Sequence, residues 1–241
     1  MANFFVDKDA FSSDPIVISG EEANHIIKVL RMKEGESLTV FDTEGNCADG
    51  VIEKIGQKEV SVSVKRRYES DTEPKLKITL FQGIPKNPKM DLIIQKATEL
   101  GVTKIVPVNT KRIVAKIEKD AKMDRLRRIA FEAAKQCGRA YVPKISDPVS
   151  FDTAIKMLKE CDAAIIPYEC EKDGKLTKDL LENATSLGII IGPEGGFEED
   201  EVEKAEKAGV KRVTLGKRIL RTETAGLIAS ALCLYVAGDM E

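Results

Sequence analysis

The first 70 residues contain short runs in which hydrophobic and polar positions alternate, as they do in half-buried β-strands. Such runs cover residues 37–41, 47–55 and 60–65, and turn residues separate them. Residues 21–31 instead repeat apolar side chains at helical spacing, with Ser19 as the expected N-cap. This part of the chain is therefore predicted to be a small β domain with one short helix.

From residue 75 onward, apolar runs of strand length alternate with amphipathic runs of helix length. The polar segment 69–74 is predicted to link the two parts, so that the domains are 1–70 and 75–241. Strands are predicted at 75–84, 104–108, 163–167, 187–191 and 210–215, and helices at 88–101, 119–138, 151–160, 176–183 and 222–237. This alternation predicts an α/β fold with a mostly parallel sheet. The helix 222–237 has almost no polar face, so we expect it to be deeply buried or shared with another subunit.

Two loops of the second domain have the features of ligand-binding segments. The first reads Gly-Pro-Glu-Gly-Gly-Phe from Gly192 to Phe197, and the second extends from Leu215 to Ala225. Each follows a predicted strand and precedes a helical run, which is where α/β sheets bind ligands. Neither loop has the glycine spacing of a phosphate-binding or dinucleotide-binding motif.

Carboxylates in and after these loops also argue against a polyphosphate ligand. Glu194 lies in the first loop, Glu223 lies in the second, and an acidic run follows the first loop at residues 198–201. Negative charge there would repel phosphate and would tolerate a ligand that carries a cation, such as a sulfonium. The alternative is that the acidic run complements a helix N-terminus and that the glycines form ordinary turns.

The composition excludes several other classes of site. His25 is the single histidine, which rules out a histidine-based triad and a multi-histidine metal site. The five cysteines are never spaced as Cys-x-x-Cys and indicate neither a disulfide framework nor a zinc site, so no metal is expected. No apolar run approaches the roughly 20 residues of a membrane span, and no signal peptide is recognisable. We therefore expect a cytoplasmic protein without membrane contact.

Positive charge is concentrated in the middle of the chain, although the whole chain has a formal net charge of −2. Residues 75–144 hold 17 lysines and arginines against 6 acidic residues, a local net charge of +11. An excess of this size favours a polyanionic partner such as nucleic acid. Much of it lies on one face of the predicted helix 119–138 and just after it, at Arg125, Arg128, Lys135 and Arg139. The alternative is the ordinary solvated face of an amphipathic helix.

The two loops and three further segments resemble the RsmE family of ribosomal RNA uridine-N3 methyltransferases, in the SPOUT superfamily. The further segments are residues 25–35, with His-x-x-x-Val-Leu-Arg, residues 89–102, and residues 136–139, with Gln-x-x-Arg. The resemblance covers nearly the whole chain, and the element Leu-Arg-x-Glu-Thr-Ala at 220–225 is specific. It implies a trefoil-knotted α/β domain after a PUA-like β-barrel, an S-adenosylmethionine (SAM) site, and a homodimer. The implied substrate is 16S rRNA of the small ribosomal subunit, methylated at uracil 1498.

The resemblance and the chemistry of the loops together assign roles to individual residues. Arg221 is the catalytic candidate, because a guanidinium beside the cofactor would stabilise a uracil anion; the alternative is a salt bridge with Glu194 or Glu223. The expected SAM-binding residues are Pro167, Gly192, Pro193, Glu194, Gly195, Gly196, Leu215, Gly216, Ile219, Leu220, Thr222, Glu223, Thr224 and Ala225. The expected RNA contacts are Arg31, Lys86, Lys96, Arg125, Arg128 and Arg139, each with the alternative of a surface charge without a partner.

Two other functions compete with this interpretation. One is a non-catalytic RNA-binding factor of ribosome assembly on the same fold, which the intact second loop disfavours. The other is an oxidoreductase on a nucleotide-binding fold, which the missing glycine fingerprint disfavours. The chain also departs from the family at Asn3, where an arginine is frequent.

Overall fold

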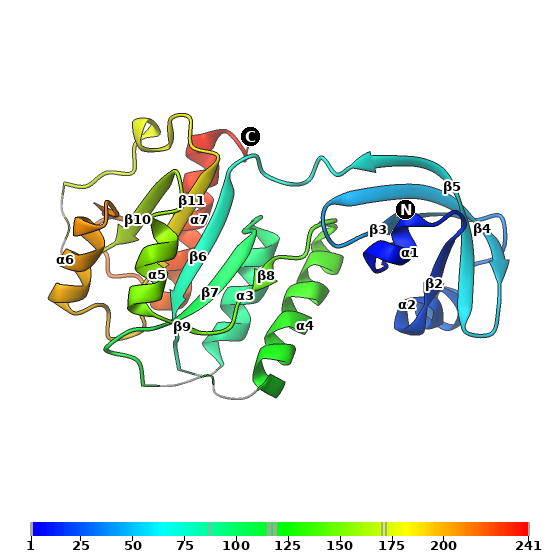
Figure 1. Ribbon diagram of the computed structural model, residues 1–241, viewed down its shortest axis with the longest axis horizontal. Coiled ribbons are helices and arrows are strands. Elements are labelled where there is room, and N and C mark those ends of the chain that lie inside the picture. Colours follow the sequence, from blue (N-terminus) through cyan, green and yellow to red (C-terminus); the bar gives the residue numbers. More distant parts are fainter. Residues whose placement is uncertain are drawn as a thin grey trace. The chain divides into compact units, whose positions relative to one another are not determined.

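The computed structural model describes residues 2–86, 88–114, 117, 120–169, 171 and 173–240, which form two compact units (Figure 1). The first unit consists of Met1–Glu73 together with Ala134–Val142, and the second of Pro74–Ala133 together with Pro143–Glu241. The predicted domains do not include the return of residues 134–142 to the first unit. That return depends on contacts between positions far apart in the sequence, which local patterns do not show.

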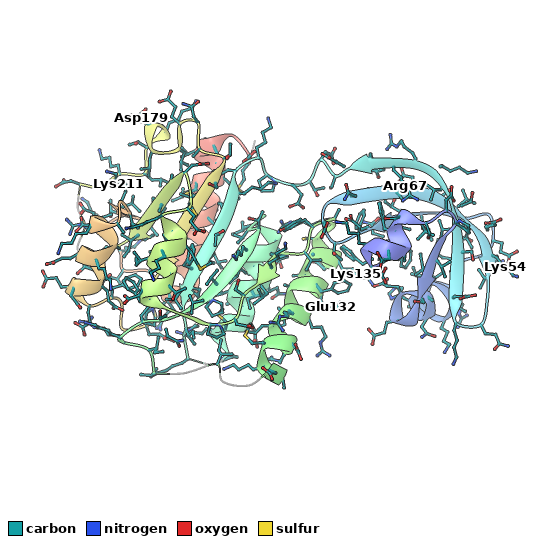
Figure 2. All side chains as sticks on the ribbon, viewed as in Figure 1. Lys54, Arg67, Glu132, Lys135, Asp179 and Lys211 are labelled. Carbon is teal, nitrogen blue, oxygen red and sulfur yellow. The ribbon has the colours of Figure 1, made fainter. Side chains whose placement is uncertain are left out.

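Two ion pairs and a backbone hydrogen bond hold the returning segment in the first unit. The Nζ of Lys135, labelled in Figure 2, lies 2.6 Å from Oε1 of Glu22, and a guanidinium nitrogen of Arg139 lies 2.6 Å from Oε2 of Glu73. The amide of Val142 donates to the carbonyl of Thr43. These basic side chains therefore serve the fold of the first unit.

A five-stranded sheet with the order β1-β3-β4-β5-β2 forms the first unit. Its strands are β1 (Asn3–Phe5), β2 (Ile16–Ser19), β3 (Ser37–Phe41), β4 (Asn46–Ile55) and β5 (Glu59–Glu69). Val60 and Val62 of β5 are fully buried at every second position, as the alternation predicts, whereas β3 is buried throughout Leu38–Phe41. The expected small β domain is confirmed.

The predicted helix at 21–31 is wrong in its type. Helix α2 (Gly20–Asn24) begins after Ser19, whose side chain makes no capping hydrogen bond, and the chain continues as a π-helix over His25–Leu30. The turn ends at Arg31, whose φ of 53° is left-handed. Apolar residues spaced by three or four do not distinguish an α-helix from a π-helix, so the sequence pattern could not show this turn. The short helix α1 (Lys8–Ser12) was not predicted either.

The second unit is built on a sheet with the strand order β12-β10-β11-β6-β7-β8, and β9 also pairs with β7. The strands are β6 (Lys77–Gly83), β7 (Lys104–Asn109), β8 (Lys144–Ile145), β9 (Val149–Ser150), β10 (Ala163–Pro167), β11 (Ser186–Ile191) and β12 (Lys211–Val213). Every strand pair described in this sheet is parallel. The predicted α/β class with a mostly parallel sheet is confirmed.

Helices cover both faces of this parallel sheet. They are α3 (Lys89–Glu99), α4 (Asp120–Cys137), α5 (Phe151–Leu158), α6 (Glu199–Lys207) and α7 (Thr222–Ala237), and a short 3-10 helix spans Lys178–Leu181. Helices α5 and α6 share a core cluster with Phe81 and Ile190, whereas Gly226 of α7 lies close to Leu80 and Ile191. Lys119, the first residue of the predicted helix 119–138, lies outside the described residues.

Helix α7 is apolar on a side that the unit does not cover. Ala229 and Cys233 are fully buried, but Ile228, Leu232 and Tyr235 are 40%, 41% and 69% exposed. These exposed residues recur at intervals of four and three, so they share one face of the helix. The expectation of deep burial is therefore wrong for this face of the helix.

Candidate functional site

A cavity of about 210 Å³ opens at the carboxyl ends of the central strands of the second unit. Because the sheet is parallel, the loops after β6, β10 and β11 meet at this edge together with the segment that leads into α7. Ten of the expected SAM-binding and catalytic residues line the cavity: Pro167, Gly192, Pro193, Glu194, Gly196, Ile219, Leu220, Arg221, Thr222 and Ala225.

A smaller cavity of about 80 Å³ shares part of this lining, including Glu169 and Ala225. The expected residues Leu215 and Gly216 line the smaller cavity. Gly195, Glu223 and Thr224 are not among the lining residues of either cavity in the described part of the chain.

Two glycines keep the first loop open. A Cβ on Gly192 would lie 3.1 Å from the backbone of Gly196 and 3.3 Å from the ring of Phe197. Gly196 has a φ of 67°, and a Cβ there would lie 3.0 Å from Oε1 of Glu169. Phe197 is 4% exposed and packs against Phe151 with 5.9 Å between the ring centroids, which anchors the loop to the core. Side chains in place of these glycines would therefore crowd the loop or fill the cradle that it forms.

A buried chain of hydrogen bonds joins the two loops. The Oγ1 of Thr222 donates to the carbonyl of Gly192 at 2.6 Å and accepts from Nε2 of Gln82 at 2.9 Å. Gln82 lies on β6 and is fully buried. Segments that lie 30 residues apart in the chain thus form one wall of the cavity.

Lys89, in the first turn of α3, connects both loops through their carboxylates. Its Nζ lies 3.1 Å from Oε1 of Glu194 and 3.1 Å from Oε2 of Glu223. The amide of Lys86 also donates to Oε1 of Glu194 at 3.1 Å. Burial raises the pKa of Glu194, but hydrogen bonds from its own backbone, from Lys89 and from Lys86 outweigh burial and hold that pKa below its ordinary value. The salt bridge considered for Arg221 is therefore made by Lys89 instead.

Arg221 is exposed at the cavity and is the N-cap residue of α7. Its carbonyl accepts from the amides of Thr224 and Ala225 at 2.8 Å, which fixes its backbone. In the described part of the chain no carboxylate forms an ion pair with its guanidinium. A guanidinium that lies beside a cavity and forms no internal ion pair is free to bind a ligand.

The acidic run after the first loop serves the protein rather than the cavity. Glu201 accepts from the amide of Glu198 at the start of α6, and its other oxygen accepts from the amide of Lys111 at 3.0 Å. Arg112 donates to Oε1 of Glu198 and to the carbonyl of Gly195, both at 2.8 Å. The acidic run is therefore better interpreted as a feature of the N-terminus of α6. It also binds residues 111 and 112.

Two charged residues of the cavity were not predicted as site residues. They are Lys89 and Glu169, which line it from the segments after β6 and β10. Their signal in the sequence was their place after a strand of a parallel sheet, at the edge where the two loops were expected. Lys89 begins the segment 89–102 that carries part of the family resemblance, but neither residue lies in the two glycine-containing loops.

Three of the expected RNA contacts are already paired within the chain. Arg125 makes a two-point contact with Asp91 at 2.9 and 2.6 Å, and Nζ of Lys96 lies 2.7 Å from Oε1 of Glu99. The side chain of Arg139 is 4% exposed and is paired with Glu73. The expectation for Arg139 is therefore wrong, because a buried guanidinium with a carboxylate partner is not accessible to RNA.

The other three expected RNA contacts, Arg31, Lys86 and Arg128, are exposed. Within the described ranges no carboxylate forms an ion pair with any of them. The neighbouring Arg127 pairs with Asp124 and Asp147. The number of unpaired basic side chains on α4 is therefore smaller than the number of basic residues in its sequence.

The described residues contain no group of three histidine, cysteine, aspartate or glutamate side chains that would hold a metal ion. Among them, no helix has both the length and the apolar character that crossing a bilayer requires. Four of the five cysteines are free thiols, and Cys170 lies outside the described residues.

Comparison with known protein families matches two parts of the chain. Residues 72–234 match an RNA methyltransferase domain, and residues 18–65 match an RNA methyltransferase PUA domain. The ribosomal RNA small subunit methyltransferase E of Bacillus subtilis is 36% identical over 227 residues, which cover 90% of this chain and 89% of that relative.

Two solved structures with bound SAM are similar over nearly the full chain. The ribosomal RNA small subunit methyltransferase E of Neisseria gonorrhoeae has a TM-score of 0.84 at 29% identity, and the match covers 98% of both chains. A methyltransferase of Legionella pneumophila has a TM-score of 0.82 at 32% identity, and the match covers 98% of this chain and 97% of that chain.

Proposed function

Because this chain belongs to the ribosomal RNA small subunit methyltransferase E family, we propose that it transfers a methyl group from SAM to N3 of a uridine in 16S rRNA. The family resemblance indicates uracil 1498 as the target. The observation that carries the proposal is the cavity at the joined loops, which Arg221 lines without an internal counter-ion among the described residues.

Two features of the cavity suit SAM, namely its glycines and its carboxylates. Gly192 and Gly196 leave a cradle that side chains would fill. Glu169 and Glu194 place carboxylates on the wall, which suits a ligand with a sulfonium and an ammonium group. We propose that the predicted residues of both cavities hold SAM, and that Gly195, Glu223 and Thr224 support the loops.

The chemistry assigned to the chain rests on Arg221. SAM supplies an electrophilic methyl group when it is bound. Transfer of the methyl group to N3 breaks the S–CH3 bond and requires that the N3 proton leaves to solvent. The guanidinium of Arg221 favours the resulting N3 anion of uracil by charge and by hydrogen bonds to the oxygens over which the negative charge spreads. The loops hold the reacting groups in one geometry. Such positioning lowers the reaction barrier by about 7 kcal/mol in well-oriented systems.

Access to the target sets a further requirement, because N3 lies on the Watson–Crick edge of the base. The uridine must be unpaired or extruded to reach the cavity. Arg31, Lys86 and Arg128 are the proposed phosphate contacts, since they are exposed. Arg125 and Lys96 are weaker candidates, because RNA would compete with their carboxylate partners.

We also propose a homodimer that covers the apolar face of α7. The exposed face formed by Ile228, Leu232 and Tyr235 supports this proposal. Light scattering after gel filtration should give twice the chain mass, and Tyr235→Glu should lower it to one chain. A wild-type protein that stays a single chain at micromolar concentration would overturn the proposal.

The reaction is tested by mapping the product. The protein is incubated with SAM and with small ribosomal subunits from a strain that lacks the modification, and the methylated nucleoside is identified by mass spectrometry. The proposal predicts one N3-methyluridine in 16S rRNA. A methyl group on another atom contradicts the proposed reaction. A protein that binds the subunits and transfers no methyl group is instead the assembly factor considered above.

A further inference from the structure

Glu169 stands where the two cavities of the site share their lining. It follows Pro167, the last residue of β10, by two positions and lines both cavities. Its Oε1 lies 3.0 Å from the place that a Cβ on Gly196 would occupy. The first loop therefore leaves room for this carboxylate by having glycine at that position, and a larger side chain there would displace it.

Glu169 differs from the neighbouring carboxylates in its ion pairing. The other carboxylate of the larger cavity, Glu194, is held by Lys89. Arg112 is close enough for its pKa to be raised, first by its hydrogen bond to Glu198 and to a smaller extent by the charge of Glu169. Arg112 nevertheless directs its hydrogen bonds to Glu198 and to a backbone carbonyl. In the described part of the chain no basic side chain forms an ion pair with Glu169.

We propose that Glu169 is a specificity-determining residue that recognises the positive charge by which SAM differs from its demethylated product. The inference rests on the proposed function. Loss of the methyl group converts a sulfonium into a neutral thioether, whereas the ammonium and carboxylate ends stay the same in both molecules. A wall carboxylate that has no counter-ion therefore stabilises SAM more than S-adenosylhomocysteine and favours release of the product.

Other polar groups of the cavity discriminate less well. Glu194 and Glu223 carry two negative charges that share the positive charge of Lys89, and they are held in place by it. In the acidic run, Arg112 binds Glu198, and Lys111 binds Asp200 and Glu201. A ligand cation at these groups would have to displace an existing ion pair, whereas Glu169 forms no ion pair with any described residue.

The test compares the affinities of SAM and S-adenosylhomocysteine by titration calorimetry. Wild type, Glu169→Gln, Glu169→Asp and the control Glu203→Gln are measured at one salt concentration. Glu203 is an exposed carboxylate on α6 that pairs with Lys207 and lines neither cavity. Glu169→Gln should weaken SAM binding about tenfold and S-adenosylhomocysteine binding less than about twofold. Glu169→Asp keeps the charge and should keep most of the preference, and Glu203→Gln should match wild type.

Two outcomes of this titration would overturn the inference. Equal losses for both ligands would make Glu169 a residue that shapes the cavity without reading charge. Unchanged affinities would mean that Glu169 does not contribute to the binding of either ligand. A wild-type protein that binds neither ligand would instead contradict the proposed function itself, so the two failures are distinguishable. Melting temperatures of the variants exclude a loss that comes from unfolding.

Discussion

Helix α4 and the cavity at the carboxyl edge of the sheet both carry charge, but the structure uses that charge in opposite ways. On α4, Arg125 and Arg127 are paired with carboxylates of the same chain. At the cavity, Arg221 and Glu169 form no ion pair with any described residue. Exposed ion pairs contribute little to stability, yet they reduce the charge that is open to a partner. A count of charges along a sequence therefore overestimates the charge that a binding surface offers. Unpaired charge beside a cavity is the better indicator of a binding site.

The largest expected effect is the replacement of Arg221 at the cavity. Arg221→Ala should lower turnover by roughly 10²- to 10³-fold, the usual loss when one donor to a developing anion is removed. The affinity for SAM should change less than about threefold, because the guanidinium is assigned to the uracil. Steady-state kinetics and calorimetry check both numbers. Lys217→Ala, an exposed cation of the same loop that lines neither cavity, is the control. Equal losses of turnover and affinity would assign Arg221 to cofactor binding instead.

A glycine pair separates backbone strain from the shape of the cavity. Gly196 and Gly209 both have positive φ, at 67° and 93°, but only the Cβ on Gly196 would meet a neighbour, Oε1 of Glu169. Gly196→Ala and Gly209→Ala should each destabilise the fold by roughly 1–2 kcal/mol. Gly196→Ala should in addition weaken SAM binding about tenfold, because crowding of this size costs on the order of 1 kcal/mol or more. Equal affinities in the two variants would contradict a role of Gly196 in shaping the SAM site.

The contrast within α4 itself predicts a smaller effect on RNA. Arg128→Gln should reduce the slope of log K against log salt by roughly 0.7–0.9, as expected for one lost phosphate contact. Arg125→Gln should leave that slope nearly unchanged and destabilise the fold by about 0.2–1 kcal/mol, since it loses its contact with Asp91. Binding of 16S rRNA fragments over a salt series gives the slopes. If both variants change the slope equally, internal pairing does not limit the charge that RNA can use.

The smallest expected effect concerns a hydrogen-bonded carboxylate that lines neither cavity of the site. Asp162 accepts hydrogen bonds from Thr185 and Ser186, which lower its pKa to about 2 from an ordinary value of 3.8. The ionised form therefore stabilises the fold at pH values above 3.8, and this contribution is lost as the pH falls from 3.8 towards 2. Asp162→Asn should be less stable than wild type at neutral pH, and the difference should shrink over that window in denaturant titrations. A constant difference from pH 7 to pH 2 would contradict the assignment.

Much of the second unit could be predicted because local pattern determines it. The residues of β10 and of α7 were predicted without error, since an unbroken apolar run and a long, almost uncharged helical run leave few alternatives. The two loops could be recognised because glycine at a strand end has a restricted set of uses. The π-helical turn at His25–Leu30 and the pairing of Arg139 could not, because periodicity does not specify helix type and a basic residue reads the same whether buried or exposed.

The electrostatics of the site required the tertiary structure. The sequence showed acidic residues around the loops, but it did not show which of them had a counter-ion. Lys89 forms ion pairs with Glu194 and Glu223, and Arg112 forms one with Glu198. Glu169 lines the cavity and forms no ion pair with any described residue. Such partners come from strands and helices that only the parallel sheet brings together.

The central claim is that the cavity at the joined loops is the SAM site, and filling it is the most direct test. Ala225 lines both cavities at the start of α7, whereas Ala237 is exposed at the other end of the same helix. Titration calorimetry of wild type, Ala225→Phe and the control Ala237→Phe should show one SAM bound per chain in wild type and control. The filled variant should bind none while it keeps its melting temperature. Undiminished SAM binding by a folded Ala225→Phe protein would contradict the account.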